Sequence, residues 1–385
     1  MLKKKIVFVQ SYELFPDFRV LNEIELLIHE KVEIHVILWQ RSIDGINISD
    51  YKNVIIHRIK VQAKHGMSAK ESITLLPRFM LKVIGYLRII KPSLIIAHNF
   101  DSMFPSAIYS IINSSKIIYV SREPTHMVFR QKLDNRLVER VGYFLDLMVA
   151  KVSSLTITVT PQLMKMYGNM GIKSLFVPNS PTKSFYESVT KKKNSNEVII
   201  GFIGTIRYDV GIKSIWNAIM YLNNNQSRRF KLFLCGMPNG GFEIEIEKMK
   251  NESPDSIIIK NPVNNDKVPD LYNGIDMICI FPTAKGQFKQ YGLSVKLFEA
   301  LAMRTPVIIS SVAENYDFIK EIDCCILSKK EPKEISEKIQ YILSNQIKIE
   351  KMVNNGYHFI ANNFNWENHS NHYKKFVYKS LNIKK

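Results

Sequence analysis

Short apolar runs alternate with stretches of helical periodicity along the chain. In the first half, we predict strands at residues 5–10, 32–39, 54–58, 94–98, 116–121 and 155–159. Apolar positions recur every three to four residues, as in amphipathic helices, at 20–30, 77–91, 102–112 and 136–152. Strands that alternate with helices of this length predict βαβ units and a parallel sheet.

The same alternation restarts after a polar segment. Residues 181–196 are rich in Lys, Asn, Ser and Thr, and they predict a linker, with a long surface loop as the alternative. Beyond the linker, strands are predicted at 198–203, 231–235, 257–260, 277–281, 307–310 and 324–327. The predicted fold class is α/β, with two Rossmann-like doubly wound domains. Its parts are a first domain (1–182), a linker (183–197), a second domain (198–362) and a C-terminal helix (363–385).

The charge balance restricts the partners. The chain has 385 residues and a formal net charge of +18, which favours polyanions, anionic membranes or phosphorylated substrates. A nucleic-acid-binding protein would carry a basic face with interleaved aromatic residues or a known reading module. Lys and Arg are scattered here instead. We therefore expect no nucleic-acid partner, although a basic, non-catalytic nucleic-acid-binding protein remains an alternative class.

The compartment is predicted from the cysteines and the N-terminus. None of the four cysteines has a spacing typical of a zinc site, and a reducing compartment fits them best. The first apolar run is too short for a secretory signal, and no run reaches the roughly eighteen apolar residues of a spanning helix. A cytoplasmic location follows as the expectation. The apolar, basic helix at 77–91 would allow contact with an anionic membrane, or it could simply cover its sheet.

The most informative segment follows the apolar run that ends at Phe281. A loop containing Gly292 leads into a helix that opens near Ser294. A helix start presents unpaired N–H groups and the positive end of its dipole, which suits a diphosphate. Lys296 adds a cation, and Glu299 lies one turn further on, where a carboxylate can accept hydrogen bonds from ribose hydroxyls. The alternative is an ordinary capped helix on which these two residues form a surface pair.

This segment resembles a known donor site. The run Lys296-Leu-Phe-Glu299-Ala-Leu-Ala, followed by Pro306-Val-Ile, is similar to the signature of retaining glycosyltransferases of the family-4 type, the glycosyl transferases group 1. The resemblance implies the GT-B fold, in which two domains face each other across a cleft and the last helix crosses back to the first domain. It also implies that Glu299 holds the donor ribose and that the helix start holds the diphosphate. The donor-binding residues implied there are Gly292, Leu293, Ser294, Val295, Lys296 and Glu299.

A second loop, Gly201 to Gly211, resembles the family's Gly-Arg-Leu loop, whose cations neutralise the leaving diphosphate. Gly204 and Thr205 are the donor-binding residues expected in it. Thr205 stands where the family's arginine usually lies, so we expect Arg207 and Lys213 to supply the catalytic cations instead. Tyr291 replaces a glutamate that many members carry eight positions before Glu299.

The first half contributes further candidates, at the ends of predicted strands or in the loops that follow them. Glu123, in a Tyr-Val-Ser-Arg-Glu run similar to a family motif, and His98 are expected as catalytic residues. Asp101, Asp17 and Arg19 are expected to bind the acceptor, the last two in an Asp-x-Arg-Val loop. Purely structural roles are the alternative for each of them, for example helix capping by Asp17.

The resemblance implies a retaining transfer from a nucleoside diphosphate sugar to a hydroxyl of a cell-envelope glycan or a polyprenyl-linked acceptor. No Asp-x-Asp motif is present, so neither a metal nor a cofactor other than the nucleotide sugar is expected. A sugar phosphorylase or a nucleotide-sugar epimerase of the same architecture is the alternative within enzymes.

Overall fold

The computed structural model describes residues 4–12, 18–28, 31–41, 54–63, 69–190, 197–281, 292–310 and 317–382. It divides into two compact units, which we describe separately. Unit 1 comprises Met1–Pro178 and His369–Lys385, and unit 2 comprises Asn179–Asn368. The last helix, α16 (Trp366–Leu381), therefore begins in unit 2 and continues as part of unit 1.

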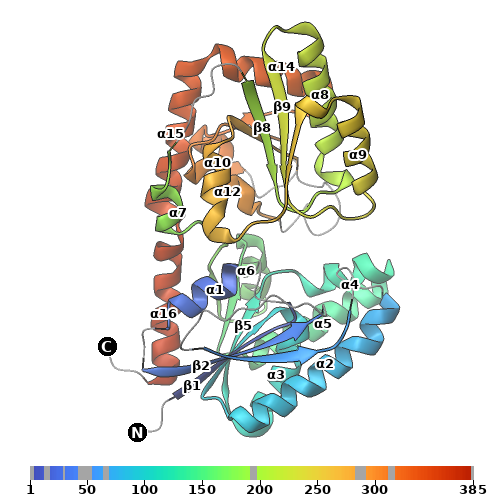
Figure 1. The fold of residues 1–385 in the computed structure, drawn as a ribbon. Helices are drawn as coiled ribbons and strands as arrows, with labels where there is room; N and C mark the ends of the chain where they lie inside the picture. Colours follow the sequence, from blue (N-terminus) through green and yellow to red (C-terminus); the bar gives the residue numbers. More distant parts are fainter. Residues whose placement is uncertain are drawn as a thin grey trace. The chain divides into compact units, whose positions relative to one another are not determined.

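Unit 1 is built on a seven-stranded parallel sheet (Figure 1). The strands are β1 (Lys4–Gln10), β2 (Val32–Gln40), β3 (Val54–Lys60), β4 (Leu94–His98), β5 (Lys116–Ser121), β6 (Leu155–Thr158) and β7 (Ser174–Phe176). Their order is β3-β2-β1-β4-β5-β6-β7. The strand order reverses at β1 and β4, and ligands of doubly wound sheets bind at the carboxyl ends of the strands beside such a point.

Helices cover both faces of this sheet. One face packs on α2 (Ala69–Ile90), α3 (Asn99–Asn113) and α5 (Arg136–Val152), and Phe79, Met103 and Leu147 are among the buried side chains they contribute. In Figure 1, α2 and α3 lie on one side of the sheet and α1 (Phe18–Glu25) lies on the other. The helices α4 (Thr125–Leu133) and α6 (Pro161–Gly168) follow β5 and β6. The C-terminal end of α16 is fixed near the amino ends of the strands, where Lys116 donates a hydrogen bond to the Ser380 carbonyl at 2.7 Å.

Unit 2 is built on a six-stranded parallel sheet of the same kind. Its strands are β8 (Glu197–Ile203), β9 (Arg229–Cys235), β10 (Ile257–Lys260), β11 (Met277–Ile280), β12 (Val307–Ile309) and β13 (Ile326–Leu327). Their order is β10-β9-β8-β11-β12-β13, so β8 lies between β9 and β11. The carboxyl ends of β8 and β11 are therefore neighbours, and these strands lead into the two glycine-containing loops identified in the sequence.

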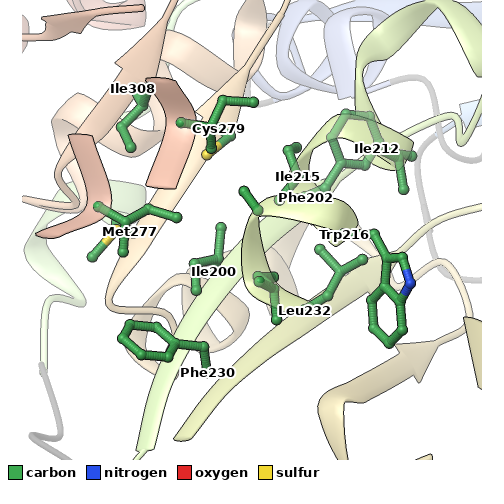
Figure 2. Close-up of a cluster of buried hydrophobic side chains, with 14 of the residues drawn as sticks. Ile200, Phe202, Ile212, Ile215, Trp216, Phe230, Leu232, Met277, Cys279 and Ile308 are labelled. Carbon is green, nitrogen blue, oxygen red and sulfur yellow. The ribbon is translucent and has the colours of Figure 1, made fainter. Parts of the chain in front are cut away.

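The two faces of this sheet have separate apolar cores. One face packs on α8 (Ile212–Asn225), α9 (Glu243–Glu252) and α14 (Pro332–Ser344), and Figure 2 shows Phe202, Trp216 and Cys279 in this core. The other face packs on α7 (Lys183–Glu187), α10 (Val268–Asn273), α12 (Val295–Ala302) and α13 (Asp317–Ile322). Residues of α15 (Gln346–Asn363) enter both cores. Single 3-10 turns lie at Tyr208–Val210, Pro254–Ser256 and Asn265–Lys267.

Several elements differ in extent from the predicted ones. Residues 183–187, inside the predicted linker, form α7, and Phe185 and Tyr186 are buried in the unit 2 core. Helix α2 begins at Ala69 and contains Pro77, where the sequence suggested a start. All four cysteines are free and buried. No helix within the described ranges is long and apolar enough to cross a membrane.

Candidate functional site

The two loops that carry the donor motif meet in unit 2. Gly204 directly follows β8, and its φ of +123° lies in a region that side-chain-bearing residues rarely adopt. A Cβ atom at Gly204 would lie 2.5 Å from Cε of Lys296, which shows that the lysine side chain occupies the space over this glycine. The Lys296 ammonium also lies 4.3 Å from the centre of the Phe202 ring. Positions that are remote in the sequence are thus in direct contact.

A second glycine fixes the shape of the loop after β8. At Gly236, which follows β9, a Cβ atom would lie 1.9 Å from the carbonyl oxygen of Gly204. The backbone N–H of Gly204 donates to the Cys235 carbonyl at 2.8 Å, and that of Ile206 donates to the Met237 carbonyl at 3.0 Å. Only glycine permits this close approach, so the loop that contacts Lys296 is held by the neighbouring loop.

Glu299 lies one turn beyond Lys296 on α12 and receives a hydrogen bond from a tyrosine. The hydroxyl of Tyr272, a fully buried residue of α10, lies 3.1 Å from Oε2 of Glu299 and 3.3 Å from the Lys296 carbonyl oxygen. Burial raises the pKa of Glu299 to about 7, although Tyr272 and Lys296 both lower it. Burial lowers the pKa of Lys296 to about 8, against the attraction of Glu299. Both groups therefore change charge near neutral pH.

Two further cations, Arg207 and Lys330, contact Asp209 in the loop after β8. Nε of Arg207 lies 3.2 Å from Oδ1 of Asp209. Lys330, which follows β13, donates a hydrogen bond to the Asp209 backbone carbonyl. The charges of Arg207 and Asp209 both act on Lys296. The positive charges of Arg207 and Lys296 therefore lie close enough to act on each other, and Lys330 adds a third cation beside Asp209, further along the same loop.

Lys213 has a different environment from these cations. It lies in the first turn of α8, with its side chain 63% exposed, and its ammonium is 3.4 Å from Oε2 of Glu245 on α9. Glu245 also binds Lys248 at 2.9 Å. The structure brings Arg207 to Lys296 but places Lys213 in an ion pair with α9. Thr205 is exposed in the loop after β8.

At the start of α12, Ser294 is the N-cap residue and its side chain makes no capping hydrogen bond. Within the described residues, the Ser294 side chain therefore does not satisfy the amide groups of the first turn. Gly292 and Leu293 precede it and are half-buried, as are Ser294 and Val295. Tyr291 and the rest of the preceding loop, 282–291, lie outside the described residues.

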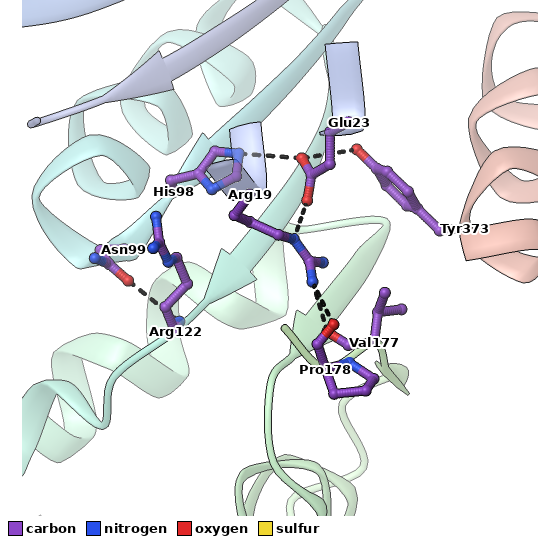
Figure 3. Close-up of polar contacts among 8 residues, drawn as sticks. All are labelled: Arg19, Glu23, His98, Asn99, Arg122, Val177, Pro178 and Tyr373. Carbon is purple, nitrogen blue, oxygen red and sulfur yellow. Dashed lines mark hydrogen bonds and ion pairs between the residues drawn. The ribbon is translucent and has the colours of Figure 1, made fainter. Parts of the chain in front are cut away.

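In unit 1, Arg19 and His98 belong to a buried network around Glu23 (Figure 3). Nε of Arg19 lies 2.6 Å from Oε1 of Glu23, and Nε2 of His98 lies 3.2 Å from Oε2. Arg19 also donates to the carbonyl oxygen of Val177 at 2.7 Å, and the hydroxyl of Tyr373 on α16 lies 3.4 Å from Glu23. Burial alone would raise the pKa of Glu23, but Arg19 and His98 lower it to about 2.

This network changes the interpretation of two predicted site residues. Arg19 is only 1% exposed and His98 only 2%. The Arg19 guanidinium therefore has a structural role within unit 1, and it offers no exposed charge to an acceptor. Nothing in the sequence indicated this pairing, except that Arg19 and Glu23 are four residues apart on a helix. Asp17, the other residue of that loop, lies outside the described ranges.

Charged side chains gather at the carboxyl ends of β1, β2, β4 and β5. Burial raises the pKa of Asp101, while the Ser11 hydroxyl and the Arg41 guanidinium lower it. Arg41 is buried, donates to the Ser11 carbonyl at 2.9 Å and stacks on Trp39 with its centre 4.6 Å from the ring. Glu123 is exposed, and the charges that act on it come from Arg122, Asp101 and Lys132. Asp101 and Glu123 are thus brought together, and Arg41 and Lys132 join them.

Four residues of the two sites, the one around Lys296 in unit 2 and the one around Asp101 in unit 1, were not identified from the sequence. Tyr272 and Lys330 belong to no motif, although Lys330 follows a predicted strand end. Arg41 likewise follows the second predicted strand, and Lys132 had no signal at all. No cluster of three or more His, Cys, Asp or Glu side chains that could hold a metal ion occurs among the residues with described positions.

Comparisons with known proteins show which family and which fold the chain resembles. Residues 186–359 match the model of the family described as "Glycosyl transferases group 1". A sucrose-phosphate synthase from Thermosynechococcus elongatus superposes with a TM-score of 0.73 at 14% identity, over 99% of this chain and 100% of that one. HepE from Anabaena, solved with UDP and glucose, gives 0.71 at 14% identity over 97% and 99% of the two chains. A UDP-N-acetylglucosamine 2-epimerase gives 0.67 at 11% identity over 100% and 98%.

A comparison by sequence with curated proteins gives no match. The structural likenesses, at such low identity, establish the fold, and the family match covers the unit that carries Lys296 and Glu299. Residues 186–359 therefore match the glycosyl transferases group 1, and the chain as a whole has the GT-B fold.

Proposed function

We propose that this protein transfers a sugar, with retention of its anomeric configuration, from a nucleoside diphosphate sugar to a hydroxyl of a cell-envelope glycan or a lipid-linked saccharide. One observation carries the donor half of the proposal. The start of α12, with Lys296, lies against Gly204 at the end of β8, and Glu299 lies one turn further along the same helix.

The chemistry required of the donor site is stabilisation of a leaving diphosphate. Negative charge develops on its oxygens as the glycosidic bond breaks, and positive groups placed in advance lower the barrier. Lys296, Arg207 and Lys330 would supply this charge together with the amides of α12. The Glu299 carboxylate would accept hydrogen bonds from the ribose. The UDP bound to HepE from Anabaena supports a uridine nucleotide as the first ligand to test.

The acceptor half of the proposal rests on unit 1. Asp101 and Glu123 lie at the carboxyl ends of the strands with Arg41 and Lys132 near them, and such a group can bind sugar hydroxyls and an anionic substituent. Arg19, His98 and Glu23 would hold the adjoining loops in place. The proposal that the anomeric configuration is retained rests on the family resemblance. NMR of the anomeric proton in the product tests it.

We propose that the reaction needs no divalent metal, because cations of the protein and a helix start can neutralise the diphosphate. The measurement is turnover in the presence of a chelator such as EDTA. Unchanged turnover is the expected result, and loss of activity that added Mg²⁺ or Mn²⁺ restores would contradict this part of the proposal.

The decisive experiment for the whole proposal has two stages. Thermal unfolding with a panel of nucleoside diphosphates identifies the base, and the nucleotide sugars of that base are then incubated with candidate acceptors. Acceptor-dependent release of the nucleoside diphosphate is expected. Conversion of the nucleotide sugar without an acceptor would indicate an epimerase, and dependence on inorganic phosphate would indicate a phosphorylase.

The likeness to a UDP-N-acetylglucosamine 2-epimerase is the reason for including an acceptor-free control. A non-catalytic nucleic-acid-binding protein would instead bind random oligonucleotides in a salt-dependent manner and would show no shift with any nucleotide. We also propose a location on the cytoplasmic face of the cell membrane, where a lipid-linked acceptor would be found.

A further inference from the structure

Large apolar side chains are exposed on the outward side of three helices of unit 1. They are Ile73, Leu81 and Ile89 of α2, Ile108, Ile111 and Ile112 of α3, and Leu137, Val141, Phe144 and Met148 of α5. We call this set the outer face of unit 1. Single exposed apolar residues are common on proteins, but contiguous groups of them mark sites of association.

The pattern is clearest on α5. Leu137, Val141, Phe144 and Met148 are spaced by four, three and four residues, so they form one stripe along the helix. The exposed fractions of Leu137, Phe144 and Met148 are 69%, 62% and 64%. The opposite side of α5 is also apolar and packs on the sheet through Leu147 and Ala150. Packing within unit 1 therefore accounts for the inner side of the helix but not for the outer stripe.

The three helices form one continuous layer. They all pack on the same face of the sheet, and α3 contacts both α2 and α5 (Figure 1). Each helix precedes a strand, β4, β5 and β6 respectively, and so runs antiparallel to the parallel strands. Ile89, Ile112 and Met148 consequently lie towards the same end of the layer. The exposed apolar residues thus lie on neighbouring helices of one layer.

The charges on this layer have one sign. Among the described side chains of α2, α3 and α5, every exposed charged residue is basic: Arg78, Lys82, Arg88, Arg136, Arg140 and Lys151. The acidic residues are less exposed, and Glu139 is paired with Arg130 at 2.7 Å. Apolar side chains interspersed with Lys and Arg are typical of surfaces that lie in the headgroup region of a bilayer.

We infer that the outer face of unit 1 docks on a bilayer that contains anionic lipids. The apolar stripe would enter the boundary between headgroups and acyl chains, and the basic residues would contact the phosphates. A second copy of this chain is a poorer occupant, because two identical basic faces repel each other. Nucleic acid is also a poorer fit, because its backbone attracts the cations but offers nothing to the aliphatic side chains.

The proposal concerns the same unit as the proposed acceptor site, but it does not depend on the donor chemistry. Docking would hold the enzyme where a lipid-linked hydroxyl is concentrated. Because vesicle binding and nucleotide binding are separate measurements, a failure of either proposal can be recognised independently of the other.

The test is co-sedimentation of the full-length protein with phosphatidylcholine vesicles that contain or lack phosphatidylglycerol. We expect binding to the anionic vesicles that decreases with salt, and little binding to phosphatidylcholine alone. The triple variant L137S, F144S and M148S should lower the partition coefficient at least about tenfold, since it removes most of the α5 stripe.

The matched control replaces equally exposed apolar residues of unit 2, in the triple variant Y221S, I244S and I347S, whose side chains are 53%, 63% and 89% exposed. It should bind vesicles as the unchanged protein does. Thermal unfolding followed by circular dichroism shows whether both variants are folded. Equal vesicle binding by the α5 variant and the control would overturn the proposal. So would a dimer, seen by light scattering, that only the α5 variant dissociates.

Discussion

Glu299 and Lys296 are two oppositely charged residues whose ionised forms are both disfavoured by burial. The pKa of Glu299 is raised to about 7 and that of Lys296 is lowered to about 8. Perturbed groups of this kind cluster at functional sites, where a ligand later supplies the missing interactions. A diphosphate beside Lys296 and a ribose beside Glu299 would stabilise the ionised form of each group.

The first prediction concerns Glu299→Gln. Because the native carboxyl keeps its proton up to about pH 7, ionisation costs the folded state stability as pH rises from 4.5 through 7. The variant should therefore be more stable than the unchanged protein at pH 8, by up to about 3 kcal/mol, and equally stable near pH 4.5. Thermal unfolding at the two pH values measures this difference.

The same variant should bind the preferred nucleoside diphosphate at least about tenfold more weakly at pH 8, which corresponds to about 1.4 kcal/mol. Glutamine keeps the shape of the native side chain, so the comparison isolates the charge of the carboxylate. Normal binding by Glu299→Gln, measured by calorimetry, would remove the carboxylate from the donor site.

The second prediction concerns Tyr272→Phe, which removes the hydroxyl that lies 3.1 Å from Glu299. That hydrogen bond lowers the pKa of Glu299, so its loss should raise the pKa further. Relative to the unchanged protein at the same pH, donor binding should be weaker at pH 7 and equal at pH 9. Tyr186→Phe, in the same core, is the control and should leave the pH profile unchanged. A uniform loss at every pH would indicate a merely structural role for Tyr272.

At the scale of elements, α1 is held in unit 1 by charge. Arg19 and Glu23 form a buried pair on α1 that reaches His98 at the end of β4, Tyr373 on α16 and the backbone after β7. Breaking a buried pair is costly because it leaves the remaining charge without a partner in a dry interior. The network therefore joins four elements that are distant in sequence.

The third prediction follows from this pair. Glu23→Gln should reduce the stability of unit 1 by roughly 3 kcal/mol at pH 7, since the Arg19 charge remains buried. Because the pKa of Glu23 is lowered to about 2, its contribution is present above pH 4.5 and is lost as pH falls through 2. Urea unfolding at pH 7 should show this difference in the free energy of unfolding between the variant and the unchanged protein. The difference should become smaller in acid. The double variant R19M and E23L, which removes both charges, should recover part of the lost stability. No recovery of stability would contradict this explanation.

The fourth prediction compares two glycines in one loop. Gly236→Ala should distort the loops after β8 and β9, because its Cβ would lie 1.9 Å from the Gly204 carbonyl oxygen. Gly240→Ala is the control, with a φ of +69° and no atom within 4 Å of its Cβ, and it should cost only about 1 kcal/mol of stability. The first variant should lose nucleotide binding at a temperature where both variants are folded. Equal nucleotide affinity in both would show that this loop does not shape the site.

At the scale of the whole molecule, the two units have separate cores and separate sheets. The proposed donor residues all belong to unit 2. A ligand that binds only the folded form of one unit stabilises that unit by mass action, by about 2.7 kcal/mol at a concentration one hundred times its Kd.

The fifth prediction is therefore a selective thermal shift. In differential scanning calorimetry, the preferred nucleoside diphosphate should raise the unfolding temperature of the transition that belongs to unit 2. The unit 1 transition should move less, and the Glu299→Gln variant should show a smaller shift in both. A ligand that raised only the transition of unit 1 would place the nucleotide on the other sheet.

Much of the fold was accessible from local patterns. Short apolar runs that alternate with helical stretches predicted the parallel sheets. The change from the apolar run that ends at Phe281 to a glycine-containing loop predicted a helix start near Ser294, where α12 begins. Glu299 and Lys296 could be proposed as donor-site residues because their residue types and spacing form a signature within one segment. The buried network of Arg19 could not be predicted, because most of it comes from remote segments. Val177 is 158 positions from Arg19, and Tyr373 is 350 positions from Glu23.

The sequence by itself determined the order of the elements, the division into two α/β halves and the segments that could face a diphosphate, since these depend on periodicity and on residues close together in the chain. Only the tertiary structure decided which side chains meet. Lys330 beside Asp209, Tyr272 beside Glu299 and Arg41 beside Ser11 are contacts between residues of segments that are separated in the sequence. The physical reason is that burial and long-range contact set the charge and the role of a polar side chain, and neither is encoded in its immediate neighbours.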